Sequence, residues 1–268
     1  MAREGELLLA RLEDKSLTLL TTRGDLQART RIDELTSATI SDDGSAVVAV
    51  GSAGQVWWLS PDLSTHHEHA IRSAAIAVAI EPFGRYLAVS DRQSNLHILD
   101  RHGRSLARVQ SPRPIRHLAF APTTPHLIAA ADFGWAGCLH LKSGEWLWSD
   151  RPVSNIGSLA VGGNDGPVLL GCFSEGIRHY AASGNPRTVW TMPGPCGLVS
   201  LSFAGDAGVA SGTAPQLFGF DARGESTFVR DVDCTPTAIA LAGLGDRVFL
   251  GDATGSLKAL RLPPGKQN

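Results

Sequence analysis

The sequence predicts an all-β fold, a seven-bladed β-propeller of four-stranded antiparallel blades in which the first and last blades are incomplete. The leading observation is a short polar turn with glycine between two apolar stretches. The turn recurs at Gly24, Gly103, Gly144, Gly184, Gly224 and Gly265. From Gly103 onward these glycines are 41, 40, 40 and 41 residues apart, and Gly24 precedes Gly103 by 79 residues, or two such intervals. A fixed period of about 40 residues is the signature of a repeat protein.

Each repeat contains four short stretches with strand character, which we name A to D in chain order. Strand A ends just before a turn, as residues 38–40 and 78–80 do. Strand B is a continuous apolar run such as residues 46–50, strand C is represented by residues 56–59, and strand D follows the glycine turn. A seventh copy of that turn, residues 59–64, lacks the glycine. Four strands per period of about 40 residues are typical of a propeller blade.

We expect one domain over residues 1–268, with blades at about 1–34, 35–73, 74–114, 115–155, 156–196, 197–236 and 237–268. The first blade contains strands B, C and D, and the last contains A, B and C before the sequence Pro263-Pro264-Gly265. Three explanations stay open. The chain belongs to a longer polypeptide, a partner supplies a strand to an open sheet edge, or the first blade is simply three-stranded.

The strand endings resemble those of WD-repeat propellers and of the related quinoprotein-like (PQQ-like) propellers, over essentially the whole chain. The resemblance rests on the A endings Phe120-Ala121-Pro122 and Ser41-Asp42-Asp43-Gly44, and on C endings such as Ile98-Leu99-Asp100. Residues 144–148 also resemble the Gly-x-x-x-Trp docking element of quinoprotein blades. The resemblance implies the propeller architecture and no catalytic residue.

Composition limits the classes of partner and compartment. The net charge of −2 supplies no general field for nucleic acid or an anionic membrane, and there is no apolar run of about 18 residues that could span a bilayer. The acidic N-terminal sequence lacks the features of a secretory signal. The four scattered cysteines (Cys138, Cys172, Cys196 and Cys234) indicate buried thiols in a reducing compartment. We expect a cytoplasmic protein without a membrane partner.

The predicted inner strands offer little chemistry. His117 and Glu81 are the only ionisable residues in the A strands, and the chain has no Gly-x-Ser-x-Gly elbow and no Walker loop. His66, His67 and His69 fit a solvated outer strand, although His67 and His69 would share one face on which a metal could bind. We therefore expect no catalytic residue, no cofactor and no metal. The alternative is a small-molecule or metal-dependent propeller enzyme of the lactonase or quinoprotein type.

The longest predicted B–C loop points to a binding surface. From the A–B turn to strand C there are 14 residues between Thr124 and Cys138, against 10 to 12 in the other blades. This loop carries Phe133 and Trp135 between glycines, and the connections flanking its blade carry three arginines, Arg113, Arg116 and Arg151. Aromatic residues with arginine are the composition of interface hot spots. We expect a non-catalytic scaffold or interaction subunit that binds a protein partner through the loop face of blades 3 to 5, within a larger complex or longer polypeptide. In the alternative interpretation Trp135 folds back into the channel mouth and the arginines are ordinary solvated charges.

Overall fold

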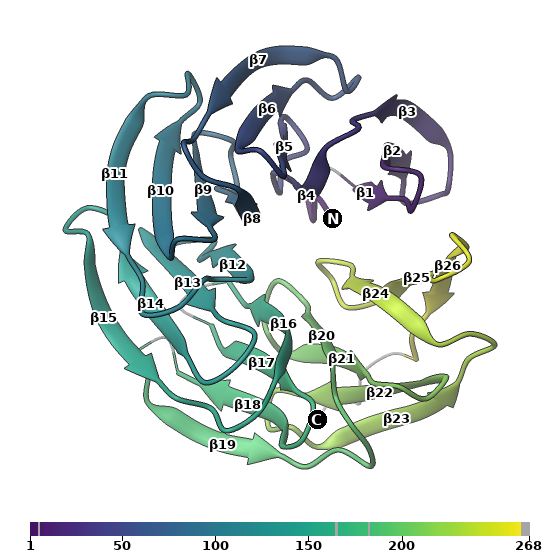
Figure 1. Cartoon of the computed structure of the whole chain (residues 1–268). Helices are drawn as coiled ribbons and strands as arrows, with labels where there is room; N and C mark the ends of the chain where they lie inside the picture. Colours follow the sequence, from purple (N-terminus) through teal and green to yellow (C-terminus); the bar gives the residue numbers. More distant parts are fainter. Residues whose placement is uncertain (5, 164–165, 182, 264–268) are drawn as a thin grey trace. The chain divides into compact units, whose positions relative to one another are not determined.

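The computed structural model describes residues 1–4, 6–163, 166–181 and 183–263. The predicted turn at Gly265, with Pro264, and the turn residues Asn164 and Asp165 lie outside the described residues. Over the described residues the chain has 26 strands and no helix, and consecutive strands pair into seven antiparallel sheets (Figure 1). Five sheets have four strands, and the first and last have three. The predicted fold class, a seven-bladed β-propeller with incomplete first and last blades, is confirmed. No helix in this part of the chain is long and apolar enough to span a membrane.

The chain divides into two compact units, Met1–Phe120 and Ala121–Asn268, which are described in turn. The first unit contains blades 1 to 3 and the strand that begins blade 4. Blade 1 consists of β1 (Leu7–Arg11), β2 (Ser16–Thr21) and β3 (Leu26–Arg31), and blade 2 of β4 (Leu35–Ile40), β5 (Val47–Gly51), β6 (Gln55–Leu59) and β7 (Thr65–Ala70). Blade 3 consists of β8 (Ala75–Ile80), β9 (Tyr86–Asp91), β10 (Asn95–Asp100) and β11 (Ser105–Gln110), and β12 (His117–Phe120) follows.

Strand β5 shows why strand B of a blade is a continuous apolar run. Successive side chains of a strand point to opposite faces of its sheet. Val48 and Val50 pack into the core between blades 2 and 3, whereas Val47 and Ala49 pack into the core between blades 1 and 2. All four residues are fully buried. A strand that is covered on both faces reads as a continuous apolar run.

The second unit contains the remaining blades. After its first strand, β12, blade 4 contains β13 (His126–Ala130), β14 (Ala136–His140) and β15 (Glu145–Asp150). Blade 5 consists of β16 (Ile156–Val161), β17 (Val168–Cys172), β18 (Gly176–Tyr180) and β19 (Pro186–Trp190). Blade 6 consists of β20 (Leu198–Leu201), β21 (Ala207–Ser211), β22 (Gln216–Asp221) and β23 (Ser226–Asp231), and blade 7 of β24 (Pro236–Leu241), β25 (Arg247–Asp252) and β26 (Leu257–Arg261).

Side chains at corresponding positions join neighbouring blades of the second unit. The hydroxyl of Ser158 accepts a hydrogen bond from the backbone N–H of Val199 at 2.8 Å, and the hydroxyl of Ser200 accepts one from Leu241 at 2.9 Å. Each bond spans 41 residues, which is one repeat. These serines lie on inner strands, so the repeat is reinforced by hydrogen bonds as well as by the apolar cores.

The repeated glycine between strands C and D has two structural reasons. Gly103, Gly144, Gly184 and the other described members have φ between 71° and 94°, where a side chain is disfavoured. Some of them also receive a ring from the preceding blade, because a Cβ placed on Gly184 would lie 2.0 Å from Cγ of Trp148. At the copy that lacks glycine, Leu63 adopts the same conformation with φ of 61°.

Candidate functional site

Three large apolar side chains of the second unit are exposed at loops that follow one another at one end of its sheets. Phe133 lies between β13 and β14 and is 46% exposed, Val153 lies between β15 and β16 and is 75% exposed, and Phe173 lies between β17 and β18 and is 41% exposed. We call these three residues the loop patch. Exposed apolar surface of this kind is typical of an interaction site.

Backbone hydrogen bonds join the three loops. The N–H of Ile156 donates to the carbonyl of Asp132 at 2.7 Å, and Phe133 forms an isolated antiparallel bridge with Asn155. The N–H of Phe173 then donates to the carbonyl of Asn155 at 3.0 Å. The residues of the loop patch are therefore carried by connected backbone, which reduces the entropy that they would lose on binding.

Two further features hold the third loop in place. Ser154 is buried, and its hydroxyl accepts a hydrogen bond from the backbone N–H of Ser174 at 3.0 Å. The ring of Phe173 lies close to the backbone at Gly157 and Gly197, where an added Cβ would come within 2.8 Å and 2.7 Å of ring carbons. Small residues at both positions therefore leave room for this ring.

The structure places the two predicted aromatic anchors differently. Phe133 presents its ring to solvent, whereas Trp135 is only 4% exposed. The Trp135 ring packs edge-on against Trp146 of β15, with 4.8 Å between ring centroids. Gly137 makes room for the indole, since a Cβ there would lie 2.8 Å from its Cζ2 atom. Trp135 thus supports the loop from inside its own sheet, and Phe133 is the member of the pair that a partner can reach.

The predicted arginines are exposed but belong to different units. Arg151 lies in the second unit, two residues before Val153. Arg113 and Arg116 lie in the first unit, in the connection between β11 and β12. Arg151 is therefore a neighbour of the loop patch in sequence, and a shared surface with Arg113 and Arg116 stays a prediction.

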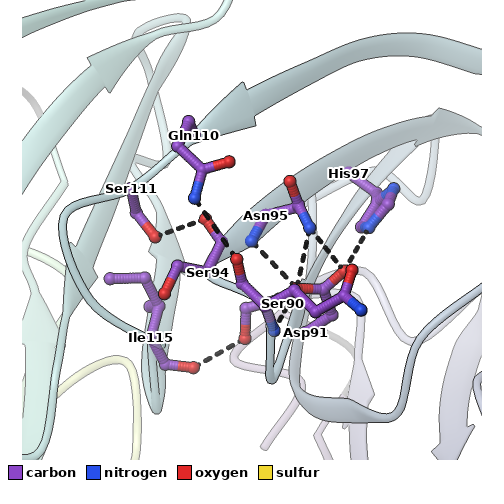
Figure 2. Close-up of polar contacts among 9 residues, drawn as sticks. Ser90, Asp91, Ser94, Asn95, His97, Gln110, Ser111 and Ile115 are labelled. Carbon is purple, nitrogen blue, oxygen red and sulfur yellow. Dashed lines mark hydrogen bonds and ion pairs between the residues drawn. The ribbon is translucent and has the colours of Figure 1, made fainter.

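A polar network in the first unit centres on the carboxylate of Asp91, which is fully buried at the end of β9. It accepts hydrogen bonds from the backbone N–H groups of Gln93 and Asn95, both at 2.9 Å, and from the Asn95 side-chain amide at 3.0 Å. The Nε2 atom of His97 lies 3.0 Å from Oδ2 of Asp91, the oxygen that also accepts the Asn95 amide (Figure 2). The four-residue turn and the next strand are thereby tied to a single side chain.

The environment of Asp91 favours its charged form. Burial alone would raise the pKa of this carboxyl, but the hydrogen bonds from His97, Asn95 and Gln93 together lower it below its ordinary value. An aspartate beside a histidine also occurs in nucleophilic triads, in which a serine contacts the imidazole. Here the neighbouring Ser90 hydroxyl donates to the carbonyl of Ile115 at 2.6 Å (Figure 2). The described contacts make Asp91 and His97 a structural pair that fastens the turn.

The other residues that the sequence offers for catalysis or metal binding lie in structural or exposed positions. Glu81 caps the turn after β8, accepting N–H bonds from Phe83 and Arg85 at 3.2 Å and 3.1 Å. His66 and His67 stack with centroids 4.8 Å apart on β7. Among the described residues, no group of three or more His, Cys, Asp or Glu side chains is placed to hold a metal ion.

All four cysteines are free thiols, and three are buried. Burial raises the pKa of Cys138 to about 11, and it is the main cause that raises the pKa values of Cys172 and Cys196 to about 12. A thiol that stays protonated at neutral pH is a poor nucleophile. Cys234, which is partly exposed, is the described cysteine most open to reagents.

Sequence reasoning missed Val153, Phe173 and the Asp91 network. Val153 and Phe173 are single apolar residues in polar loops, and only the backbone hydrogen bonds between these loops and the loop of Phe133 make them part of the candidate site. The signal for the network was the pair Ser90-Asp91 at the end of an apolar strand, with His97 at an inward position of the next.

Compared with known proteins, the chain matches no family model and no curated protein. The β-propeller architecture is shown by the strands and their pairing, and the resemblance to the WD-repeat and quinoprotein-like superfamilies stays a prediction.

Proposed function

We propose that this chain is a non-catalytic scaffold or interaction subunit that binds another protein through the loop face around blades 3 to 5. The observation that supports the proposal is the loop patch, in which Phe133, Val153 and Phe173 are exposed on loops joined by backbone hydrogen bonds. Arg151 supplies a charge beside it. Arg113 and Arg116, which lie in the first unit, stay predicted partner-binding residues.

The chemistry of the loop patch suits a protein partner. Two phenylalanine rings and a valine offer apolar area without a hydrogen-bonding group, so they provide binding energy but little means of orienting a small polar substrate. Aromatic residues with an adjacent arginine are the side chains that most often dominate protein interfaces. The supporting residues Trp135 and Ser154 would act indirectly, by keeping the loops in place.

Co-purification from the native host tests the proposal. Tagged wild-type chain is compared with the double variant Phe133→Ala, Phe173→Ala and with the control Val229→Ala, which truncates a 57% exposed valine on β23. We expect the double variant to retain at least about tenfold less partner, because truncation of an interface hot-spot residue costs about 2 kcal/mol or more. The control should retain as much partner as wild type. Equal retention by all three proteins, with unchanged thermal unfolding, would remove the proposal.

A further inference from the structure

Blade 3 has two turns at one end of its sheet, the turn from β8 to β9 and the turn from β10 to β11. Both turns have the same polar arrangement. In the first turn, Glu81 accepts the backbone N–H of Arg85 and binds the Arg85 guanidinium. In the second, Asp100 accepts the backbone N–H of Arg104 at 2.9 Å and binds the Arg104 Nε at 2.7 Å. The corresponding turns of blade 2 run from Ser41 to Ser45 and from Ser60 to Ser64 and have neither charge at these positions.

The two turns are joined, and they present cations to solvent. The backbone N–H of Arg101 donates to the carbonyl of Arg85 at 3.1 Å. The Glu81 and Asp100 side chains are each 10% exposed, whereas the side chains of Arg85 and Arg104 are 61% and 76% exposed. The acids therefore lie beneath the guanidinium groups and fix them through one edge. Arg101 adds a third exposed guanidinium at the same turn.

Two exposed aromatic rings flank Arg85. Its guanidinium carbon lies 5.6 Å from the ring centroid of Phe83 and 5.9 Å from that of Tyr86. These rings are 53% and 38% exposed. Contacts at this distance are favourable and further restrict the arginine. Arg85 is thus held by the Glu81 carboxylate and by contacts with two rings before any ligand arrives.

We propose that Arg85 and Arg104, with Arg101 between them, form a docking surface for an acidic segment of a partner protein. A guanidinium pairs with a carboxylate through two parallel hydrogen bonds, so an arginine fixed through one edge can still present another to an Asp or Glu side chain. Phe83 and Tyr86 contact the apolar parts of the same segment. This surface consists of other residues than the loop patch and needs no contribution from it.

The charge balance favours an acidic peptide over nucleic acid. Two of the three arginines already have an acidic partner, Glu81 and Asp100, and the whole chain has a net charge of −2. Binding to a phosphate backbone draws on many uncompensated cations and on a positive field. A short acidic segment needs only a few well-placed guanidinium groups, which is what the two turns supply.

The test is a titration of the full chain with a fluorescently labelled oligoglutamate peptide at low ionic strength, followed by anisotropy, with ¹⁵N–¹H spectra to locate the site. We expect saturable binding, with signal changes at the turns around Arg85 and Arg104. Arg85→Gln and Arg104→Gln should each weaken binding by about tenfold, the loss expected for a hydrogen bond to a charged group. The matched control Arg23→Gln, an exposed arginine in the corresponding turn of blade 1, should bind as wild type does.

Three results would overturn this proposal: no saturable binding of oligoglutamate, an equal loss in Arg23→Gln, or tighter binding of a labelled oligothymidylate than of oligoglutamate. The last result would assign the surface to nucleic acid. The ¹⁵N–¹H spectra of the variants show whether each remains folded, so a loss of binding is assigned to the side chain.

Discussion

Replacing Asp91 by alanine tests whether the buried network fastens blade 3. The change removes the acceptor of two backbone N–H groups, of the Asn95 amide and of the His97 imidazole. Each hydrogen bond to a charged group contributes about 1.5–3 kcal/mol. Because Gln93 is exposed and its N–H can turn to water, the total is smaller than the sum. We expect the free energy of unfolding of Asp91→Ala to be about 3–5 kcal/mol lower than that of wild type. This is the size of the loss when one partner of a buried ion pair is removed.

The assay is urea unfolding followed by circular dichroism, with Asp252→Ala as control. Asp252 occupies the corresponding turn of blade 7 and accepts the N–H groups of Thr254 and Ser256 at 2.9 Å and 3.1 Å, but it is partly exposed and has no histidine partner in those bonds. The control should lose clearly less stability than Asp91→Ala. Equal losses of unfolding free energy in the two variants would refute the view that burial and the His97 contact make Asp91 important for stability.

The pH dependence of the stability of the wild-type chain follows from the lowered pKa of Asp91. A carboxyl whose pKa is lower in the folded chain stabilises the fold fully above its unfolded pKa of about 3.9 and loses that contribution as the pH falls through the folded value. Wild type should therefore lose more stability than Asp91→Asn when the pH is lowered through this range. A parallel acid dependence of the two proteins would contradict the assignment.

Further predictions concern the repeat glycines and the thiols. Gly184→Ala should lower the free energy of unfolding by about 2–4 kcal/mol, since it adds a clash with Trp148 to an unfavourable φ of 84°; Gly24→Ala, with φ of 94° and nothing within 4 Å of its Cβ, should cost only about 1–2 kcal/mol. Denaturant unfolding compares them, and equal costs would exclude a role for the ring. In the native chain at neutral pH, iodoacetamide should label Cys234 and spare Cys138, as mass spectrometry of the digested peptides would show; labelling of Cys138 at the same rate would contradict its burial.

The fold could be predicted from the sequence because the repeat imposes the same physical demands on every blade. A middle strand such as β5 is covered on both faces and must be apolar throughout, and a tight turn with positive φ favours glycine, as at Gly144. Both requirements produce sequence patterns that recur at a fixed spacing. Leu63 is an exception to the glycine pattern. It adopts the same positive φ, 61°, while its side chain is buried in the core between blades 1 and 2.

The candidate site could be predicted only in part, because exposure is decided by tertiary contacts. Phe133 and Trp135 lie two residues apart in one loop and look alike in the sequence, yet only Trp135 is buried, where it packs against Trp146 and close to Gly137. Val153 and Phe173 gain significance from backbone hydrogen bonds between loops, which no local pattern encodes.

Amide hydrogen exchange of the chain, alone and with its co-purified partner, tests the proposed interaction role most directly. We expect the partner to slow exchange in the loops that carry Phe133, Val153 and Phe173, while the outer strand β23 (Ser226–Asp231) exchanges as before. Unchanged exchange in all three loops, with protection confined to other segments, would contradict the assignment of the loop patch as the partner-binding surface.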